Sequence, residues 1–227
     1  MTLRAIRSFV RREGRMTPAQ SDALQALWPR YGFNYEPERA DLDALFGRAA
    51  PRVLEIGFGN GDALLALAER EPGTDFLGIE VHRPGAGSLL RRAAASSITN
   101  LRVSTHDAVE VLRDQIPSAS LAAVHLYFPD PWPKKRHHKR RIVQPDFVAL
   151  VAERLVDGGR FHLATDWVPY AEWMLEVVAA CDALENAHAG GAYSPRPDTR
   201  PLTRFEQRGM RLGHSVNDLI VVRKSRR

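Results

Sequence analysis

The chain has 227 residues, of which 44% are hydrophobic and 26% charged, a balance typical of a globular protein with a sizeable core. No apolar run reaches the roughly 18 residues of a membrane-spanning helix, so we expect no membrane partner. The net charge is +5, and the basic excess gathers in residues 1–15, after Trp132 and in the last five residues. Such clusters favour a polyanion, most often nucleic acid, as the partner.

The one cysteine, Cys181, lies in an apolar helical pattern and is expected to be a buried structural residue. A single thiol can form no internal disulfide and no zinc cluster, so a reducing compartment, the cytoplasm, is expected. The adjacent His137 and His138 lack the further spacing of metal ligands, and we therefore predict no metal site.

In chain order, residues 1–16 form a predicted basic N-terminal arm, and residues 17–227 form a single predicted domain that opens with a short helix and loop. From Arg52 onward, apolar runs alternate with helical patterns. Continuous apolar runs are typical of buried parallel strands, and their alternation with helices predicts a doubly wound α/β fold with a mostly parallel sheet. The predicted strands are 52–56, 75–80, 101–107, 121–128, 159–166 and 217–224, the predicted helices are 62–70, 85–95, 108–116, 145–155 and 169–184, and the proline-punctuated stretch 194–201 is a predicted loop.

An acidic residue stands at the end of each of the first five predicted strands. Ligands of open parallel sheets bind beyond the carboxyl ends of the strands. The sequence therefore predicts a carboxylate-lined site at one edge of the sheet, formed by Glu55, Glu80, Asp107, Asp130 and Asp166.

The first of these strands runs into the glycine-rich stretch EIGFGNGD. Gly57, Gly59 and Gly61 allow positive φ and a close approach of the backbone to a ligand at the start of a helix. The signal is weak by itself, because a plain tight turn has the same composition. A dinucleotide fingerprint needs a third glycine where Asp62 stands, and a phosphate-binding P-loop needs a Lys–Ser/Thr pair, which is absent. We expect Asp62 to be the N-cap of the following helix.

A ring of carboxylates repels a phosphate-bearing cofactor and favours a cationic one. S-adenosylmethionine carries a sulfonium, an ammonium and one carboxylate, so we predict it as the cofactor. Glu80 follows Glu55 by 25 residues, near the roughly 20-residue spacing at which an acid meets ribose hydroxyls. Asp107 is placed to meet the adenine edge, and Glu55 can hold the methionine end. A nicotinamide cofactor, or none, stays an alternative.

The segment PDPWPKKRHHKRRIV places Asp130 beside six basic residues and two histidines, Lys134 to Arg141. Lysine and arginine neutralise phosphates without reading sequence. A carboxylate can accept hydrogen bonds from N1–H and N2–H of guanine, and it stabilises the positive charge that develops on the base when N7, which needs no general base, is methylated. The alternative is a rigid turn with an aspartate cap. Trp132 either stacks on a base or packs beside the prolines.

The stretch PDPWPKKRHHKRRI resembles the signature of the bacterial tRNA (guanine-N7)-methyltransferases. The resemblance covers most of the chain and includes SFVRREGRMTPAQSDAL, LWPRYGFNY, VLEIGFGNGDALLALA, TDWVPYAEWM and TRFEQRGMRLGH. It implies a seven-stranded, Rossmann-like fold of the class I S-adenosylmethionine-dependent methyltransferases. It also implies methylation of the variable-loop guanine 46 of tRNA. The protein is expected to be a monomer or a homodimer, a choice that the sequence does not decide. Residues that depart from the family pattern are Pro84, Ala86, Ser215 and Asn217.

The resemblance further implies roles for single residues, with Asp130 as the catalytic residue. Implied cofactor contacts are Glu55, Gly57, Gly59, Gly61, Glu80, Asp107 and Asp130; implied substrate contacts are Lys134, Asp166, Thr203, Arg204, Phe205 and Glu206; implied RNA contacts are Arg136, His137, His138, Lys139, Arg140 and Arg141. Thr203 and Glu206 also fit a capping box that opens a helix. The alternatives are a non-catalytic RNA-binding protein on a methyltransferase scaffold, a methyltransferase of a small molecule or protein, and a nicotinamide oxidoreductase.

Overall fold

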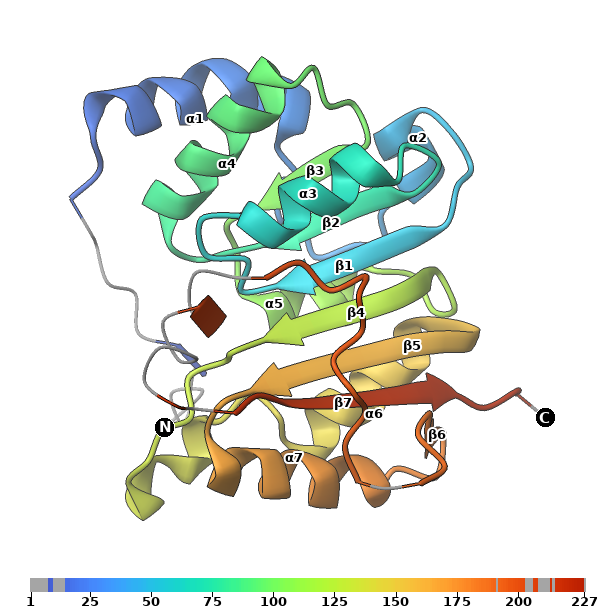
Figure 1. The fold of residues 1–227 in the computed structure, drawn as a ribbon. Coiled ribbons are helices and arrows are strands. Elements are labelled where there is room, and N and C mark those ends of the chain that lie inside the picture. Colours follow the sequence, from blue (N-terminus) through green and yellow to red (C-terminus); the bar gives the residue numbers. More distant parts are fainter. Residues whose placement is uncertain are drawn as a thin grey trace, which may run out of the picture.

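The computed structural model describes residues 8–9, 15–190, 192–202, 206–207, 213 and 215–226. Its centre is a seven-stranded sheet in the order β3-β2-β1-β4-β5-β7-β6 (Figure 1). Strands β1 to β5 run parallel, and β7 runs antiparallel to both β5 and β6. The predicted doubly wound, mostly parallel fold is therefore confirmed. The strands are β1 Arg52–Ile56, β2 Asp75–Ile79, β3 Leu101–Ser104, β4 Leu121–Tyr127, β5 Leu155–Thr165, β6 Leu184–Asn186 and β7 Asn217–Arg223.

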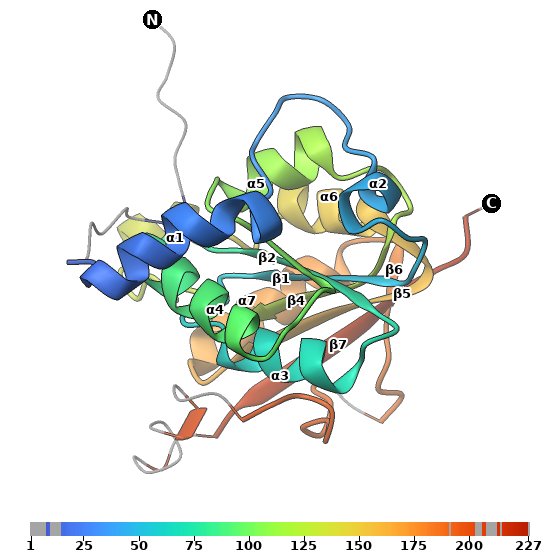
Figure 2. The ribbon, with the colours of Figure 1, turned by 90° about the horizontal axis from the view of Figure 1, so that it is seen from above.

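Helices cover both faces of this sheet. In the described residues these are α1 Pro18–Tyr31, α2 Leu42–Phe46, α3 Asp62–Arg70, α4 Arg83–Ala95, α5 Ala108–Glu110, α6 Pro145–Arg154 and α7 Val168–Ala179, with a π-helical turn η1 Val111–Gln115 and a 3-10 turn η2 Lys135–Arg140. Figure 2 shows α3 and α4 on one side of β1 and β2, and α5 and α6 on the other. The core accordingly has two apolar clusters, one containing α1, α3 and α4 and the other containing α5, α6 and α7. Val53 and Leu54 enter different clusters because successive strand side chains point to opposite faces.

Several elements differ from the prediction. The predicted helix 108–116 consists of the short α5 and the π-helical turn η1, and β5 begins at Leu155 rather than at 159. The predicted helix 169–184 ends at Ala179, and Leu184 begins β6, a three-residue strand that pairs with β7. Helix α2 was not predicted either; the side chain of Asp41 caps it by accepting a hydrogen bond from the backbone N–H of Ala44 at 2.9 Å. In the part of the chain that the structure describes, no helix combines the length and the apolar character that crossing a bilayer requires.

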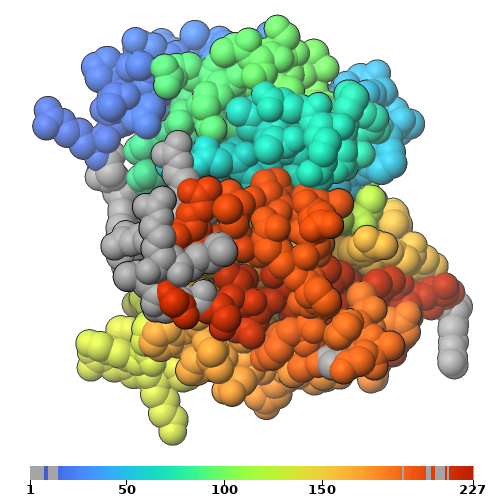
Figure 3. Space-filling view, viewed as in Figure 1, coloured from blue at the N-terminus to red at the C-terminus, as the bar shows by residue number. Residues whose placement is uncertain are grey.

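Residues 192–202, which include the predicted loop, run across the face of the sheet (Figure 1). They lie on the surface between α3 and the side of the molecule that carries α7 (Figure 3). Ser194 forms a bridge with Asp218 of β7, and the Arg70 side chain of α3 donates to the carbonyl of Thr199 at 3.0 Å. This crossing segment is therefore anchored both at the sheet and at α3.

Candidate functional site

Two adjoining cavities lie at the carboxyl ends of β1, β2 and β4, the sheet edge at which the sequence predicted a site. The first has a volume of about 420 Å³ and is lined by Glu80 and Asp130, among others. The second has a volume of about 350 Å³ and is lined by Glu55 and the glycine-rich loop after β1. The residues that line both cavities are Gly57, His82, Tyr127 and Phe128.

The glycine-rich loop has the left-handed backbone that its composition predicted. Gly57, Gly59 and Gly61 have φ values of 74°, 59° and 76°. A Cβ added at Gly57 or Gly59 would meet no atom within 4 Å, whereas one at Gly61 would lie 2.7 Å from the Leu89 side chain of α4. Gly57 and Gly59 thus leave open space beside the cavities, and Gly61 permits close packing of the loop on α4.

Glu80 fastens this loop to the end of β2. Its carboxylate accepts hydrogen bonds from the backbone N–H groups of Gly59 and His82, both at 2.8 Å. Burial raises the pKa of Glu80, the two backbone hydrogen bonds oppose the rise, and the nearby carboxylate of Asp130 adds to it. Glu80 and Asp130 are thus electrostatically coupled across the first cavity.

Glu55 is a deeply buried acid at the second cavity. It is 3% exposed, and its Oε2 atom has no hydrogen-bond partner within the described residues. Burial, with a smaller contribution from Glu80, raises the pKa of Glu55 to about 8. A buried carboxyl group without a partner is costly, and a cationic group in the second cavity would compensate it. The sequence alone predicts a negative charge at Glu55, whereas burial in the folded chain favours its protonated form.

Asp107 has a structural task at this edge. It is 8% exposed and caps α5, because its Oδ1 accepts a hydrogen bond from the backbone N–H of Val109 at 2.9 Å. The next residue, Ala108, lines the first cavity. The predicted adenine contact of Asp107 stays a prediction.

Asp62 does not have the role that the sequence predicted. Gly61 is the N-cap of α3, and Asp62 is the first helical residue. Its carboxylate pairs with the guanidinium of Arg92 on α4 at 2.6 Å, and Arg92 also donates to the carbonyl of Asn60. An ion pair between helices, rather than a cap, therefore positions Asp62. The N-cap prediction was wrong because local sequence does not show the approach of α4.

Asp130 is exposed on a rigid loop after β4. Asp130 stands between Pro129 and Pro131. Phe128, before the first proline, has a φ of 51°, and Trp132, after the second, has a φ of 45°. A left-handed conformation costs a residue other than glycine about 1–3 kcal/mol, and it persists only where the surroundings enforce it. Phe128 is held by β5, since its backbone N–H donates to the carbonyl of Ala164 at 2.8 Å. The loop therefore holds the carboxylate of Asp130 at the wall of the first cavity.

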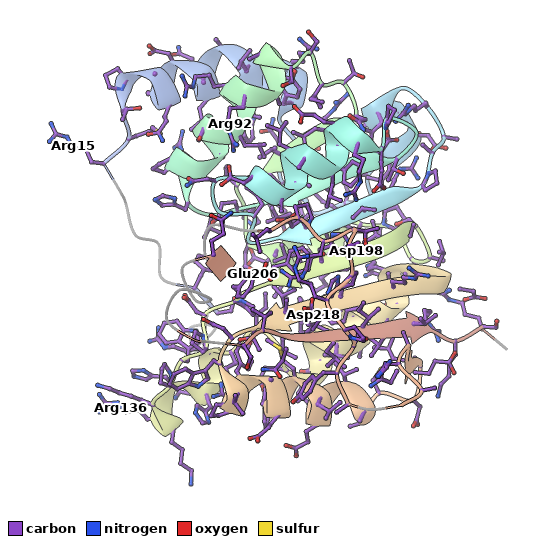
Figure 4. All side chains as sticks on the ribbon, viewed as in Figure 1. Arg15, Arg92, Arg136, Asp198, Glu206 and Asp218 are labelled. Atoms are coloured by element: carbon purple, nitrogen blue, oxygen red, sulfur yellow. The ribbon has the colours of Figure 1, made fainter. Side chains whose placement is uncertain are left out.

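The basic block continues directly from this loop. Lys134, Lys135, Arg136 and Lys139 are exposed, and Arg136 points away from the molecule in Figure 4. Trp132 is held by its neighbours and is not free to stack on a base. Its indole N–H donates to the carbonyl of Ser8 at 3.2 Å. Its ring centre lies 5.1 Å from the guanidinium carbon of Arg140, and the His137 ring packs edge-on against it. The described part of the block thus combines exposed cations with a tryptophan-centred cluster.

Arg141 departs from its predicted role as an RNA contact. It is only 4% exposed, its Nε donates to the carbonyl of Pro131 at 2.9 Å, and its guanidinium lies 4.8 Å from the centre of the Tyr170 ring. A buried arginine in this arrangement cannot reach a polyanion without leaving the carbonyl that it binds. The structure instead shows Arg141 fastening the Asp130 loop to α7.

The predicted substrate contacts are only partly described. Lys134 is exposed and Asp166 is half-buried after β5, whereas Glu206 is 2% exposed and paired with Arg200 and Arg196. Thr203, Arg204 and Phe205, and with them the capping box, lie outside the described residues.

Four buried residues with polar groups in or behind the cavity wall were not predicted from the sequence: Tyr127, His162, Arg200 and Asp218. His162 and Asp218 stand inside apolar strand patterns, a signal that could have been read from the sequence, since polar groups in buried strands need partners. Arg200 gave no such signal, because it lies in a proline-punctuated loop of the kind that usually stays on the surface.

Comparison of the sequence with known proteins shows the family of this chain. A family model described as "Putative methyltransferase" matches residues 49–219. The tRNA (guanine-N(7)-)-methyltransferase of Aeromonas hydrophila is 59% identical over 221 residues, which are 97% of this chain and 93% of that protein. The chain belongs to the tRNA (guanine-N(7)-)-methyltransferase family. A second member, from Halorhodospira halophila, is 58% identical and covers 96% of this chain and 94% of its own.

The fold extends to methyltransferases outside this family. The solved structure of the 16S rRNA methyltransferase KamB aligns with a TM-score of 0.60 at 17% identity, over 83% of this chain and 95% of that one. At this identity the likeness concerns the fold alone. It agrees with the resemblance to the class I methyltransferases that the sequence motifs indicated.

Proposed function

We propose that this protein transfers the methyl group of S-adenosylmethionine to N7 of guanine 46 in the variable loop of tRNA. One structural observation carries the proposal beyond the family relationship: Asp130, on a rigid loop, lines the same cavity as Glu80 and leads directly into the exposed basic block. A carboxylate-lined pocket and a phosphate-binding surface are thus adjacent. Small-molecule methyl transfer would leave the exposed cations without a task.

The second cavity fits the methionine end of the donor. Glu55 offers an oxygen without a partner to the donor's ammonium, and Gly57 and Gly59 leave the space that the ligand backbone needs. Glu80 would face the ribose hydroxyls from the first cavity, because its two backbone hydrogen bonds leave lone pairs on both oxygens. When bound, S-adenosylmethionine supplies an electrophilic methyl group on a sulfonium.

Asp130 would recognise the acceptor base and assist the reaction. Its carboxylate can accept hydrogen bonds from N1–H and N2–H of guanine, which adenine lacks. Guanine N7 has a free lone pair, so its attack on a methyl group requires no general base. Positive charge develops on the base as the bond forms, and a carboxylate held rigidly beside it stabilises that charge.

The basic block would hold the tRNA backbone. Lys134, Lys135, Arg136 and Lys139 are exposed and can each neutralise a phosphate. Asp166 and the segment Thr203–Glu206 are the further predicted substrate contacts. A cytoplasmic location and a monomer or homodimer stay predictions that accompany this function.

The test incubates the protein with an unmodified tRNA transcript and methyl-labelled donor, and maps 7-methylguanosine by aniline-induced strand scission. We expect scission at guanine 46 and none in a matched transcript that carries adenine there. Label at another position would refute the assigned site. Absence of label together with intact RNA binding would favour the non-catalytic alternative, which calorimetry with the donor separates further, because a decayed scaffold would not bind it.

A further inference from the structure

A line of buried polar side chains runs from the cavity wall into the sheet. Tyr127 lines both cavities. Its hydroxyl lies 3.1 Å from Nδ1 of His162, and Nε2 of His162 lies 2.6 Å from Oδ1 of Asp218. Burial raises the pKa of Tyr127, so the phenol keeps its proton. In the Nε2–H tautomer of His162, the hydroxyl donates to Nδ1 and the imidazole Nε2–H donates to Asp218.

Arg200 extends this line to Glu206. The guanidinium donates from Nη1 and Nη2 to the two oxygens of Glu206 at 2.6 and 2.7 Å, and from Nη2 to Oδ2 of Asp218 at 3.1 Å. Its Nε lies 2.8 Å from Oδ1 of Asp218, an ion-pair distance without hydrogen-bond alignment. Arg196 also donates to Glu206, so two cations and two anions form a balanced cluster. Figure 4 labels Glu206 near the carboxyl ends of the strands and Asp218 near β7.

Arg200 also contacts the wall of the reaction cavity. Its guanidinium carbon lies 5.8 Å from the ring centre of Tyr127 and 5.9 Å from that of Phe128, the left-handed residue that begins the Asp130 loop. The side chain itself is 0% exposed. One buried cation thus touches the cavity wall on one side and Glu206, in a predicted substrate-binding segment, on the other.

Stability alone is a poor explanation for this cluster. Removing the charges of Arg200, Glu206 and Asp218 from water costs much of the free energy that their attraction returns, and an apolar cluster of the same volume often stabilises a fold as well. A planar, bidentate arginine fork does fix the relative positions of the groups that it joins. The cluster lies where such fixing matters, because it joins the crossing segment 192–202, through Arg196 and Arg200, to Asp218 of β7 and to the cavity wall.

We propose that Arg200 is a positioning residue for methyl transfer. From within the crossing segment, its fork binds Glu206 and its guanidinium packs on the wall formed by Tyr127 and Phe128, so that the segment and Glu206 are held against this wall and the guanine is presented to Asp130. The proposal deepens the proposed function and rests on it. Arg200 is too deeply buried to touch the RNA, and it acts through the groups that it holds.

The test substitutes Arg200→Lys, which keeps the charge and removes the fork. Arg226→Lys is the matched control, because Arg226 is exposed and pairs with Asp157 at 2.6 Å on the surface. In Arg200→Lys we expect kcat/KM for tRNA to fall about 100-fold, as misplacement of about 1 Å can cause. The Kd for S-adenosylmethionine should stay within about threefold, and amide hydrogen exchange should become faster in residues 192–202. The control should match the wild type in all three measurements.

Each other outcome refutes the positioning role. A wild-type kcat/KM in Arg200→Lys shows that the fork is dispensable, and a fall in kcat/KM without faster exchange shows that the segment is not what Arg200 holds. A rise in donor Kd equal to the fall in kcat/KM assigns the cluster to the donor cavity. If Arg200→Lys does not fold, the isosteric Asp218→Asn takes its place, and a wild-type kcat/KM there overturns the proposal. A wild-type protein that methylates no tRNA refutes the proposed function instead.

Discussion

Glu55 gives a quantitative prediction about donor binding. Its pKa is raised to about 8, whereas an ordinary glutamate ionises near 4.5. If the carboxylate form binds the cationic donor, affinity follows the ionised fraction, which rises from about 1% at pH 6.0 to about 24% at pH 7.5. We therefore expect the Kd for S-adenosylmethionine to fall about 25-fold over that interval. Glu55→Gln should bind the donor weakly with little dependence on pH.

The same ionisation affects folding, with a definite sign. Because the pKa of Glu55 is higher in the folded than in the unfolded chain, the stability that this group contributes is fully present below pH 4.5 and is lost as the pH rises through 8. Glutamine does not ionise, so Glu55→Gln does not lose stability in this way as the pH rises. Its free energy of unfolding, relative to the wild type, should therefore rise by about 4 kcal/mol between pH 5 and pH 9.

Calorimetry at several pH values measures the first effect, and denaturant unfolding at pH 5 and pH 9 measures the second. Glu176→Gln is the matched control, because Glu176 is exposed on α7, and it should change neither quantity. A donor Kd in the wild type that stays constant from pH 6.0 to 7.5 would refute the assignment of Glu55 to the donor's ammonium. A Glu55→Gln variant whose relative stability does not depend on pH would refute the burial argument itself.

Three further predictions concern the rest of the site. Asp130→Asn should leave the donor Kd within about twofold of the wild type and lower kcat about 100-fold or more, as loss of one preorganised electrostatic contact does; wild-type turnover would contradict the electrostatic role. Gly57 and Gly47 have nearly the same φ, 74° and 73°, and a Cβ added at either position meets no atom within 4 Å, so Gly47→Ala is the matched control for Gly57→Ala. Each variant should lose about 1–2 kcal/mol of unfolding free energy through backbone strain. Only Gly57→Ala should weaken donor binding in calorimetry. Equal donor affinities in the two variants would show that Gly57 does not face the donor. Replacing Lys134 and Arg136 with glutamine should reduce the slope of log K against log salt for tRNA binding by about 1.5 to 2 and leave the donor Kd unchanged; an unchanged slope would place the RNA elsewhere.

Much of the fold was predictable because its signals are local. The buried runs of β1 and β2 and the helical pattern of α3 each lie within ten residues of sequence, and the alternation of such runs restricts the sheet to a few arrangements. Strand β6 was not predicted because three residues are too short for a recognisable hydrophobic pattern. These residues form a strand because they pair with β7, which lies more than 30 residues later in the sequence. The ending of α7 at Ala179 follows from the same contact.

The candidate site was predictable as a place and less so as chemistry. Glu55, Glu80 and Asp130 come together because the carboxyl ends of parallel strands meet at one edge, which is a rule of topology. Their protonation was not predictable, since the pKa of Glu55 depends on how completely its neighbours exclude water. The burial of Arg141 within a basic run could not be read from composition either.

The sequence by itself determined the strand and helix pattern, the glycine-rich turn, the acids at the strand ends and the basic block, because each depends on residues that are close along the chain. Only the tertiary structure decided which charges are exposed and which are paired. Arg200, Asp218 and His162 meet across 18 to 56 residues of sequence, and desolvation of their charges arises from packing that no local pattern specifies.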